Sequence, residues 1–206
     1  MKKILLGFIA IGLLTFVGCG TSSPVKIGKQ EWMSENLNVD HFRNGEIIPE
    51  VKTEEEWKKA RKENRAAWCY YENDISKYGK LYNWYAVSDP RGLAPEGWHV
   101  PTDAEWTVLE DYLADNGHNG AALKATSGWM VQDSSGTDDY EWNGLPGGYR
   151  GAKGGFYDVG NYGYWWSSSE SNTSSAWNLN LSFSFDDVDI DYSDKSIGFS
   201  VRCLRN

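Results

Sequence analysis

The chain has 206 residues and a formal net charge of −9 at pH 7. This length suffices for one domain with a hydrophobic core. The acidity disfavours nucleic acid as a partner, because its phosphates would be repelled. Eleven Trp, twelve Tyr and 22 Gly favour a loop-rich fold with strands and tight turns over a helical bundle.

The N-terminus has the parts of a secretory signal peptide. Two lysines precede the apolar run 4–17, which is short of the roughly 20 residues that span a bilayer. Gly18 stands directly before Cys19, as in bacterial lipoproteins, where the cysteine is lipidated before cleavage. We therefore expect residues 1–18 to be a lipoprotein signal peptide, Cys19 to be lipidated, and residues 19–24 to form a flexible tether.

The lipid would anchor the protein in the cell envelope, since each buried methylene group contributes about 0.8 kcal/mol. We favour the outer membrane over the inner membrane, and an uncleaved transmembrane anchor is the alternative. Removing residues 1–18 leaves 188 residues and changes the charge from −9 to −11, because the two lysines are their only charged residues. The sequence leaves open which face of the membrane carries the domain.

The remaining cysteines form an even pair. Lipidation of Cys19 leaves Cys69 and Cys203 in an oxidising compartment. The sequence predicts a disulfide between them, worth about 2–4 kcal/mol. Two separate buried thiols are the alternative.

Two capping boxes predict helices. The first begins at Thr53 and is expected to run to about Asn64, with Trp57 and Ala60 as its buried stripe. The second begins at Thr102. In this second helix, Glu105 returns a bond to the N-cap, and the inward face carries Trp106, Leu109 and Leu113.

Strands are predicted at both ends of the domain. An aromatic-rich segment lies between them. Residues 25–33 read as an opening hairpin and residues 198–204 as a final strand. The aromatic side chains of segment 66–85 are expected to fill a core with an irregular backbone, with a stacking surface for sugars as the alternative.

Alternating apolar residues predict a further hairpin over residues 177–192. A two-residue turn at Asp186 and Asp187 would pair 185 with 188, 183 with 190 and 181 with 192. A longer loop is the alternative, because Asp-Asp is a weak turn sequence.

One face of this hairpin offers oxygen atoms that could bind calcium. We call it the hairpin face, and its residues are Asn178, Asn180, Asp187, Asp189 and Asp191. We favour the alternative of a solvated acidic face that discourages aggregation through the sheet edge. No other metal or cofactor is expected.

Six stretches, taken together, resemble the Fibrobacter succinogenes major paralogous domain family. They are residues 28–37, 78–84, 95–106, 145–150, 165–168 and 198–203. They occur in the family's order within a domain that we place at residues 25–206. The resemblance implies an α+β, C-type-lectin-like fold with two short helices around small antiparallel sheets, similar to formylglycine-generating and sulfatase-modifying domains. It also implies an exported lipoprotein, and it implies no particular activity.

The sequence gives little support for an enzyme. His41, His99 and His118 are scattered, and there is no Gly-x-Ser-x-Gly turn or His-Glu-x-x-His helix. Trp177-Asn178-Leu179 lacks the carboxylate of a calcium-dependent lectin triplet. We therefore expect a non-enzymatic binding or adhesion domain, whose partner is a glycan or an envelope protein. A structural envelope lipoprotein without a ligand and an enzyme of unknown class are the alternatives.

Overall fold

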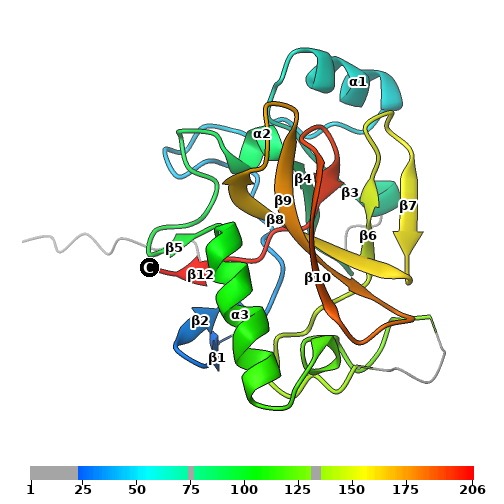
Figure 1. Ribbon diagram of the computed structural model, residues 1–206. Coiled ribbons are helices and arrows are strands. Elements are labelled where there is room, and N and C mark those ends of the chain that lie inside the picture. Colours follow the sequence, from blue (N-terminus) through cyan, green and yellow to red (C-terminus); the bar gives the residue numbers. More distant parts are fainter. Residues whose placement is uncertain (1–22, 74–76, 131–135) are drawn as a thin grey trace, which may run out of the picture.

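The computed structural model describes residues 23–73, 77–130 and 136–206 (Figure 1). Within these ranges it confirms the α+β class, with short helices, mostly antiparallel strands and no closed barrel. The α-helices are α1 (Glu54–Lys62), α2 (Trp84–Val87) and α3 (Asp103–Asp115). The strands are β1 (Val25–Ile27), β2 (Gln30–Trp32), β3 (Trp68–Tyr70), β4 (Lys80–Asn83), β5 (Trp98–His99), β6 (Gly147–Arg150), β7 (Phe156–Val159), β8 (Tyr162–Glu170), β9 (Ser175–Ser182), β10 (Val188–Asp194), β11 (Gly198–Phe199) and β12 (Leu204–Arg205).

The strands form two sheets. The smaller has the order β1-β2-β12-β5, so the predicted opening hairpin is present and pairs with a strand from the far end of the domain. The larger has the order β10-β9-β8-β6-β11-β4-β3, with β7 paired to β6. Its only parallel pair among the described strands is β6 with β8. The helix α3 contacts β8, β9 and β10 and lies at the lower left of Figure 1, whereas α1 and α2 lie at the upper end.

Both predicted helices begin at their capping boxes. Thr53 and Thr102 each accept a hydrogen bond from the backbone of the N3 glutamate, whose side chain returns to the N-cap. Trp57 is buried on α1. On α3 the buried residues are Trp106, Leu109 and Leu113, as helical spacing predicts.

The helix α2 is absent from the sequence prediction. Asn83 caps it by accepting a hydrogen bond from the Ala86 amide at 3.2 Å. The same Asn83 oxygen accepts from the Ala67 amide at 3.0 Å, so the cap also joins β4 to the segment before β3. Segment 66–85 is therefore more regular than expected, although its aromatic side chains do fill the core, as Trp68, Tyr82 and Trp84 show.

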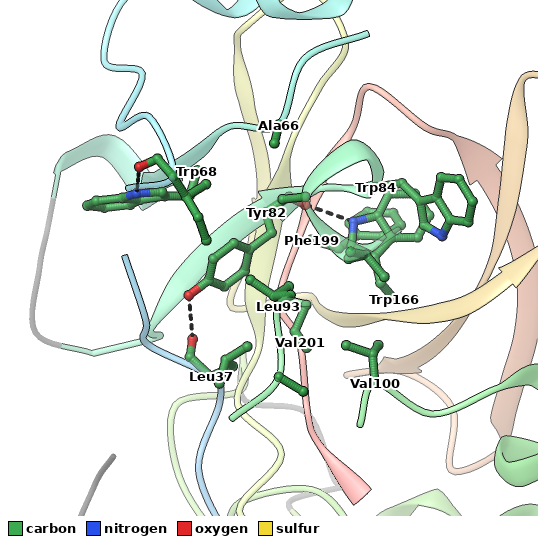
Figure 2. Packing of buried hydrophobic residues seen from close by; sticks show 14 of the residues in the cluster. Leu37, Ala66, Trp68, Tyr82, Trp84, Leu93, Val100, Trp166, Phe199 and Val201 are labelled. Carbon is green, nitrogen blue, oxygen red and sulfur yellow. Dashed lines mark hydrogen bonds between the residues drawn. The ribbon is translucent and has the colours of Figure 1, made fainter. Parts of the chain in front are cut away.

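The centre of the core lies beneath α2. Tyr82, Trp84, Trp166 and Phe199 gather there, and the Trp166 indole donates to the Tyr82 carbonyl at 2.8 Å (Figure 2). A second cluster packs α3 against the other face of β8 and β9, and a third lies beneath α1.

The C-terminal hairpin is present, but its predicted register is wrong. Val188 pairs with Leu181 rather than residue 185, so a loop of residues 183–187 replaces the two-residue turn. The buried Lys124 holds this loop, since its Nζ donates to the Phe185 carbonyl at 2.6 Å and to Asp186 at 2.9 Å. The shift is even, so the residues that remain paired keep their predicted faces, whereas Phe185 lies in the loop and is 64% exposed.

The predicted final strand is divided into β11 and β12. Residues 200–203 cross from the larger sheet to the smaller, and their carbonyls accept from Trp166, Leu37 and Met33. Side chains are buried on both sides of this crossing, as Val201 and Arg202 show. An uninterrupted strand could not reach both sheets.

Candidate functional site

A surface hollow of about 420 Å³ is lined by residues of elements that lie in the upper part of Figure 1, among them α1 and α2. Four separate segments line it: the end of α1, the start of α2, the turn between β8 and β9, and the end of β10. We call it the hollow, and its lining residues are Arg61, Asn64, Trp84, Tyr85, Thr173, Ser174, Asp194 and Lys195.

Backbone hydrogen bonds fix these segments to one another. The Lys195 carbonyl accepts from the Trp84 amide at 2.9 Å, which ties α2 to the end of β10. The Lys195 amide donates to the Ser174 carbonyl at 3.0 Å, which adds the β8–β9 turn. Asn64 adopts a φ of 48°, the left-handed conformation in which helices commonly end.

A buried ammonium group supports the floor of the hollow. The Lys195 side chain is only 7% exposed; it forms an ion pair with Glu170 and donates to the Thr173 carbonyl at 2.9 Å. Its Nζ lies 4.7 Å from the centroid of the Trp84 ring, a cation–π distance. The charge is therefore satisfied, and its role is to position the indole and the turn.

The rim offers hydrogen-bonding groups to solvent. The Arg61 side chain is 46% exposed, and its guanidinium reaches Asp194 at 3.4 Å. One Asp194 oxygen accepts from the Ser196 amide at 2.8 Å, and the other faces Arg61. Burial, together with the Asp194 charge, raises the pKa of Tyr85, so its hydroxyl stays neutral at physiological pH. The hollow thus combines aromatic rings with donors and acceptors for a polar ligand.

The sequence did not identify this site. Tyr85 lies in the segment considered as a sugar-stacking surface, and that was the one available signal. Arg61 lies on the polar side of the predicted α1, and Asp194 follows the predicted hairpin.

The five residues of the hairpin face do not lie together on one exposed surface. Asn178 and Asn180 are buried; Asn180 donates to the Asp189 carboxylate at 3.1 Å, and Asn178 donates to the Asp191 carbonyl at 3.1 Å. Asp187 lies in the loop before β10. In the described ranges, no three His, Cys, Asp or Glu side chains come together as ligands for a metal ion. Of the favoured solvated face only the three aspartates are exposed, and calcium binding there stays the untested alternative.

The predicted disulfide is wrong: Cys69 and Cys203 are both buried thiols. Neighbouring residues of a strand point to opposite faces. Trp68 therefore faces the core cluster that contains Cys203, whereas Cys69 faces the separate cluster beneath α1. Burial raises the pKa of Cys69 to about 11, so this thiol is protonated and unreactive.

The shared sequence stretches meet around Asn36. Its side-chain oxygen accepts from Trp165 Nε1 at 2.8 Å and from Arg202 Nη2 at 2.7 Å. Its amide group donates to the Tyr78 carbonyl at 2.9 Å and to Ser200 Oγ at 3.3 Å. Four of the six stretches are thus joined by one side chain, which gives these residues a structural role.

Of the remaining candidate residues, the histidines each contact a nearby carboxylate, and the N-terminal residues lie outside the described ranges. His41 contacts Asp40, His99 contacts Glu105, and His118 contacts Asp139. Cys19 and residues 1–18 lie outside the described residues, as does most of the 19–24 tether. None of the helices that the structure describes has the length and apolarity needed to cross a lipid bilayer.

Comparisons with known proteins agree with the sequence resemblance on the family. A search of curated proteins and a search of solved structures gave no significant match. One family model, described as the Fibrobacter succinogenes major domain, matches residues 25–205, which is most of the chain. The chain therefore belongs to the Fibrobacter succinogenes major domain family.

Proposed function

We propose that this protein is a non-enzymatic binding domain of the cell envelope, and that the hollow holds a sugar unit of a glycan. One observation carries the proposal: Trp84 and Tyr85 line the same 420 Å³ space as the side chains of Arg61 and Asp194. That volume lies within the range of about 300–1,000 Å³ typical of small-molecule sites.

The chemistry of the hollow suits a saccharide. A sugar ring has an apolar face that can lie on an aromatic ring and hydroxyl groups that both donate and accept hydrogen bonds. Asp194 would accept from a hydroxyl, and Arg61 would donate to one. Because Lys195 is already paired with Glu170, it adds little unpaired charge that would demand an acidic ligand.

Lipidation at Cys19 would display this domain at a membrane, and we propose the outer membrane. The domain would then meet glycans or envelope proteins without binding lipid through its own surface. The acidic composition supports the proposal that nucleic acid is not a partner. We also propose a C-type-lectin-like architecture, on the basis of the sequence resemblance.

The absence of catalysis is part of the proposal. In the described part of the chain the three histidines contact three different carboxylates and so form no shared cluster, and the buried Cys69 thiol is protonated. The residues around Asn36 act in the fold, which leaves the ligand to other residues at the surface.

A glycan array with the full chain in detergent micelles tests the proposal. We expect binding to a restricted set of glycans, weakened by Tyr85→Ala and by Arg61→Ala at least about tenfold, as the loss of about 1.4 kcal/mol would produce. Tyr192→Ala, which removes an aromatic ring that is 54% exposed on β10, is the matched control and should bind normally.

Two outcomes would contradict the proposal. Binding that Tyr85→Ala and Arg61→Ala leave unchanged would place the glycan elsewhere. No binding, together with an envelope defect when the gene is deleted, would favour a structural lipoprotein without a ligand.

A further inference from the structure

A second surface feature lies at the right of Figure 1, where β7 ends and β8 begins. Four tyrosines from β6, β7 and β8 gather there, and we call them the tyrosine cluster. The ring centroids of Tyr149 and Tyr157 are 5.4 Å apart, as are those of Tyr149 and Tyr164, and Tyr162 stacks on Tyr164 at 5.6 Å. The cluster shares no residue with the hollow.

Two glycines allow the three strands to approach closely. A Cβ atom on Gly148 would lie 2.2 Å from the Tyr157 carbonyl oxygen, and one on Gly163 would lie 2.6 Å from the Leu145 carbonyl oxygen. The two glycines also face each other across the parallel β6–β8 pair. The tyrosine rings are therefore held together by the backbone.

The cluster is anchored on one side and open on the other. Tyr164 stacks on the buried Phe199 with a centroid distance of 4.8 Å, which fixes its ring. Tyr157 is 50% exposed, and Tyr149 and Tyr162 are half-buried. Aromatic surface is thus accessible to a ligand around a fixed centre.

A carboxylate lies beside these rings without a cation. The Tyr164 hydroxyl donates to Asp158 Oδ2 at 3.5 Å, and no basic side chain of the described residues lies within 4.0 Å of that carboxylate. Burial, together with the Asp158 charge, raises the pKa of Tyr149 and of Tyr164, so both rings stay neutral. Neutral π faces and a negative charge together attract a cation.

We propose that the tyrosine cluster and Asp158 bind a substituted ammonium group carried by a small organic molecule. The rings would contact the alkyl substituents, and the carboxylate would balance the charge. A bare metal ion fits less well, because one carboxylate and phenol hydroxyls supply too few strong oxygen ligands.

Titration of the full chain in detergent micelles with choline tests this proposal by calorimetry and by NMR of labelled tyrosines. We expect the Tyr149, Tyr157 and Tyr162 signals to shift. The uncharged analogue 3,3-dimethylbutan-1-ol has the same shape, and it should bind at least about fivefold more weakly because it lacks the charge.

Asp158→Asn is the decisive variant. Asp158 has a φ of 62°, and asparagine adopts this left-handed conformation readily, so the fold should be kept. We expect its affinity for choline to fall about two- to fivefold, as the loss of a partly exposed charge pair predicts. Asp189→Asn, which removes an exposed carboxylate on β10, is the control and should bind choline normally.

The proposal is overturned if choline and its uncharged analogue bind equally, if Asp158→Asn binds as the wild type does, or if choline does not bind at tens of millimolar. Tyr85→Ala should keep choline binding, so failure at the hollow and failure at the tyrosine cluster are separate results.

Discussion

Asn36 shows how much can depend on one uncharged side chain. Arg202 is fully buried, and burial lowers its pKa to about 9, yet its guanidinium remains charged at neutral pH. Its partners are oxygen atoms of Asn36 and of backbone carbonyls, including those of Met33 and Trp142. A buried cation of this kind is tolerated only while each donor has an acceptor.

We predict that Asn36→Ala lowers the free energy of unfolding by about 2–4 kcal/mol, because Arg202 and the Trp165 indole both lose an acceptor. Denaturant unfolding measures the change. Asn36→Asp keeps the acceptor for Arg202 but loses the donor to the Tyr78 carbonyl, so it should also destabilise the fold. The control is Asn38→Ala at an exposed position, expected within about 0.5 kcal/mol of the wild type; an equally small effect of Asn36→Ala would contradict the prediction.

At the scale of elements, the start of α3 links the helix to both ends of the domain. Glu105 accepts from the Thr102 amide at 2.8 Å, and one of its oxygens lies 2.9 Å from His99 Nε2 on β5. The Glu105 carbonyl also accepts from the Gln30 side chain at 2.8 Å. Burial alone would raise the pKa of Glu105, but the bonds from Thr102 and His99 outweigh it and lower the pKa below the ordinary 4.5.

This shift predicts acid sensitivity. The lowered pKa stabilises the fold fully above about pH 4.5, and this contribution is lost as the pH falls through the pKa of the folded protein. We therefore expect Glu105→Gln, which cannot titrate, to be less stable than the wild type at pH 6, with the difference shrinking towards pH 3. Thermal unfolding across this range measures it, and a constant difference would count against the assignment.

Elements whose signal lies in neighbouring residues were predicted well, whereas features that depend on contacts between distant segments were not. The capping boxes at Thr53 and Thr102 placed both helix starts correctly, because the whole signal lies within four residues. For the C-terminal hairpin the two-residue turn was wrong and the alternative of a longer loop is confirmed; Lys124, about sixty residues earlier, holds that loop. No pattern within the hairpin encodes that contact.

The candidate site was beyond prediction for the same reason. Arg61, Tyr85 and Asp194 come from three different elements, and they meet only after the larger sheet has formed. Their spacing along the chain resembles no motif. The family, by contrast, was predictable, because its stretches keep their order along the sequence.

At the scale of the whole molecule, the two cysteines lie in different core clusters, so no disulfide between them contributes to the stability of the fold. We predict that a reducing agent leaves the unfolding midpoint unchanged. We also predict that alkylation in denaturant without reductant labels both Cys69 and Cys203. A digest that yields a cross-linked Cys69–Cys203 peptide pair would contradict this.

The pairing of β2 with β12 also sets an order of events during synthesis. Leu204 pairs with Trp32, so the opening hairpin, among the first described segments to leave the ribosome, has no neighbour on that side until residue 204 follows. A contact between segments so distant in sequence forms slowly. The growing chain therefore cannot complete the smaller sheet until residue 204 has been made, and until then the opening hairpin presents an unpaired strand edge.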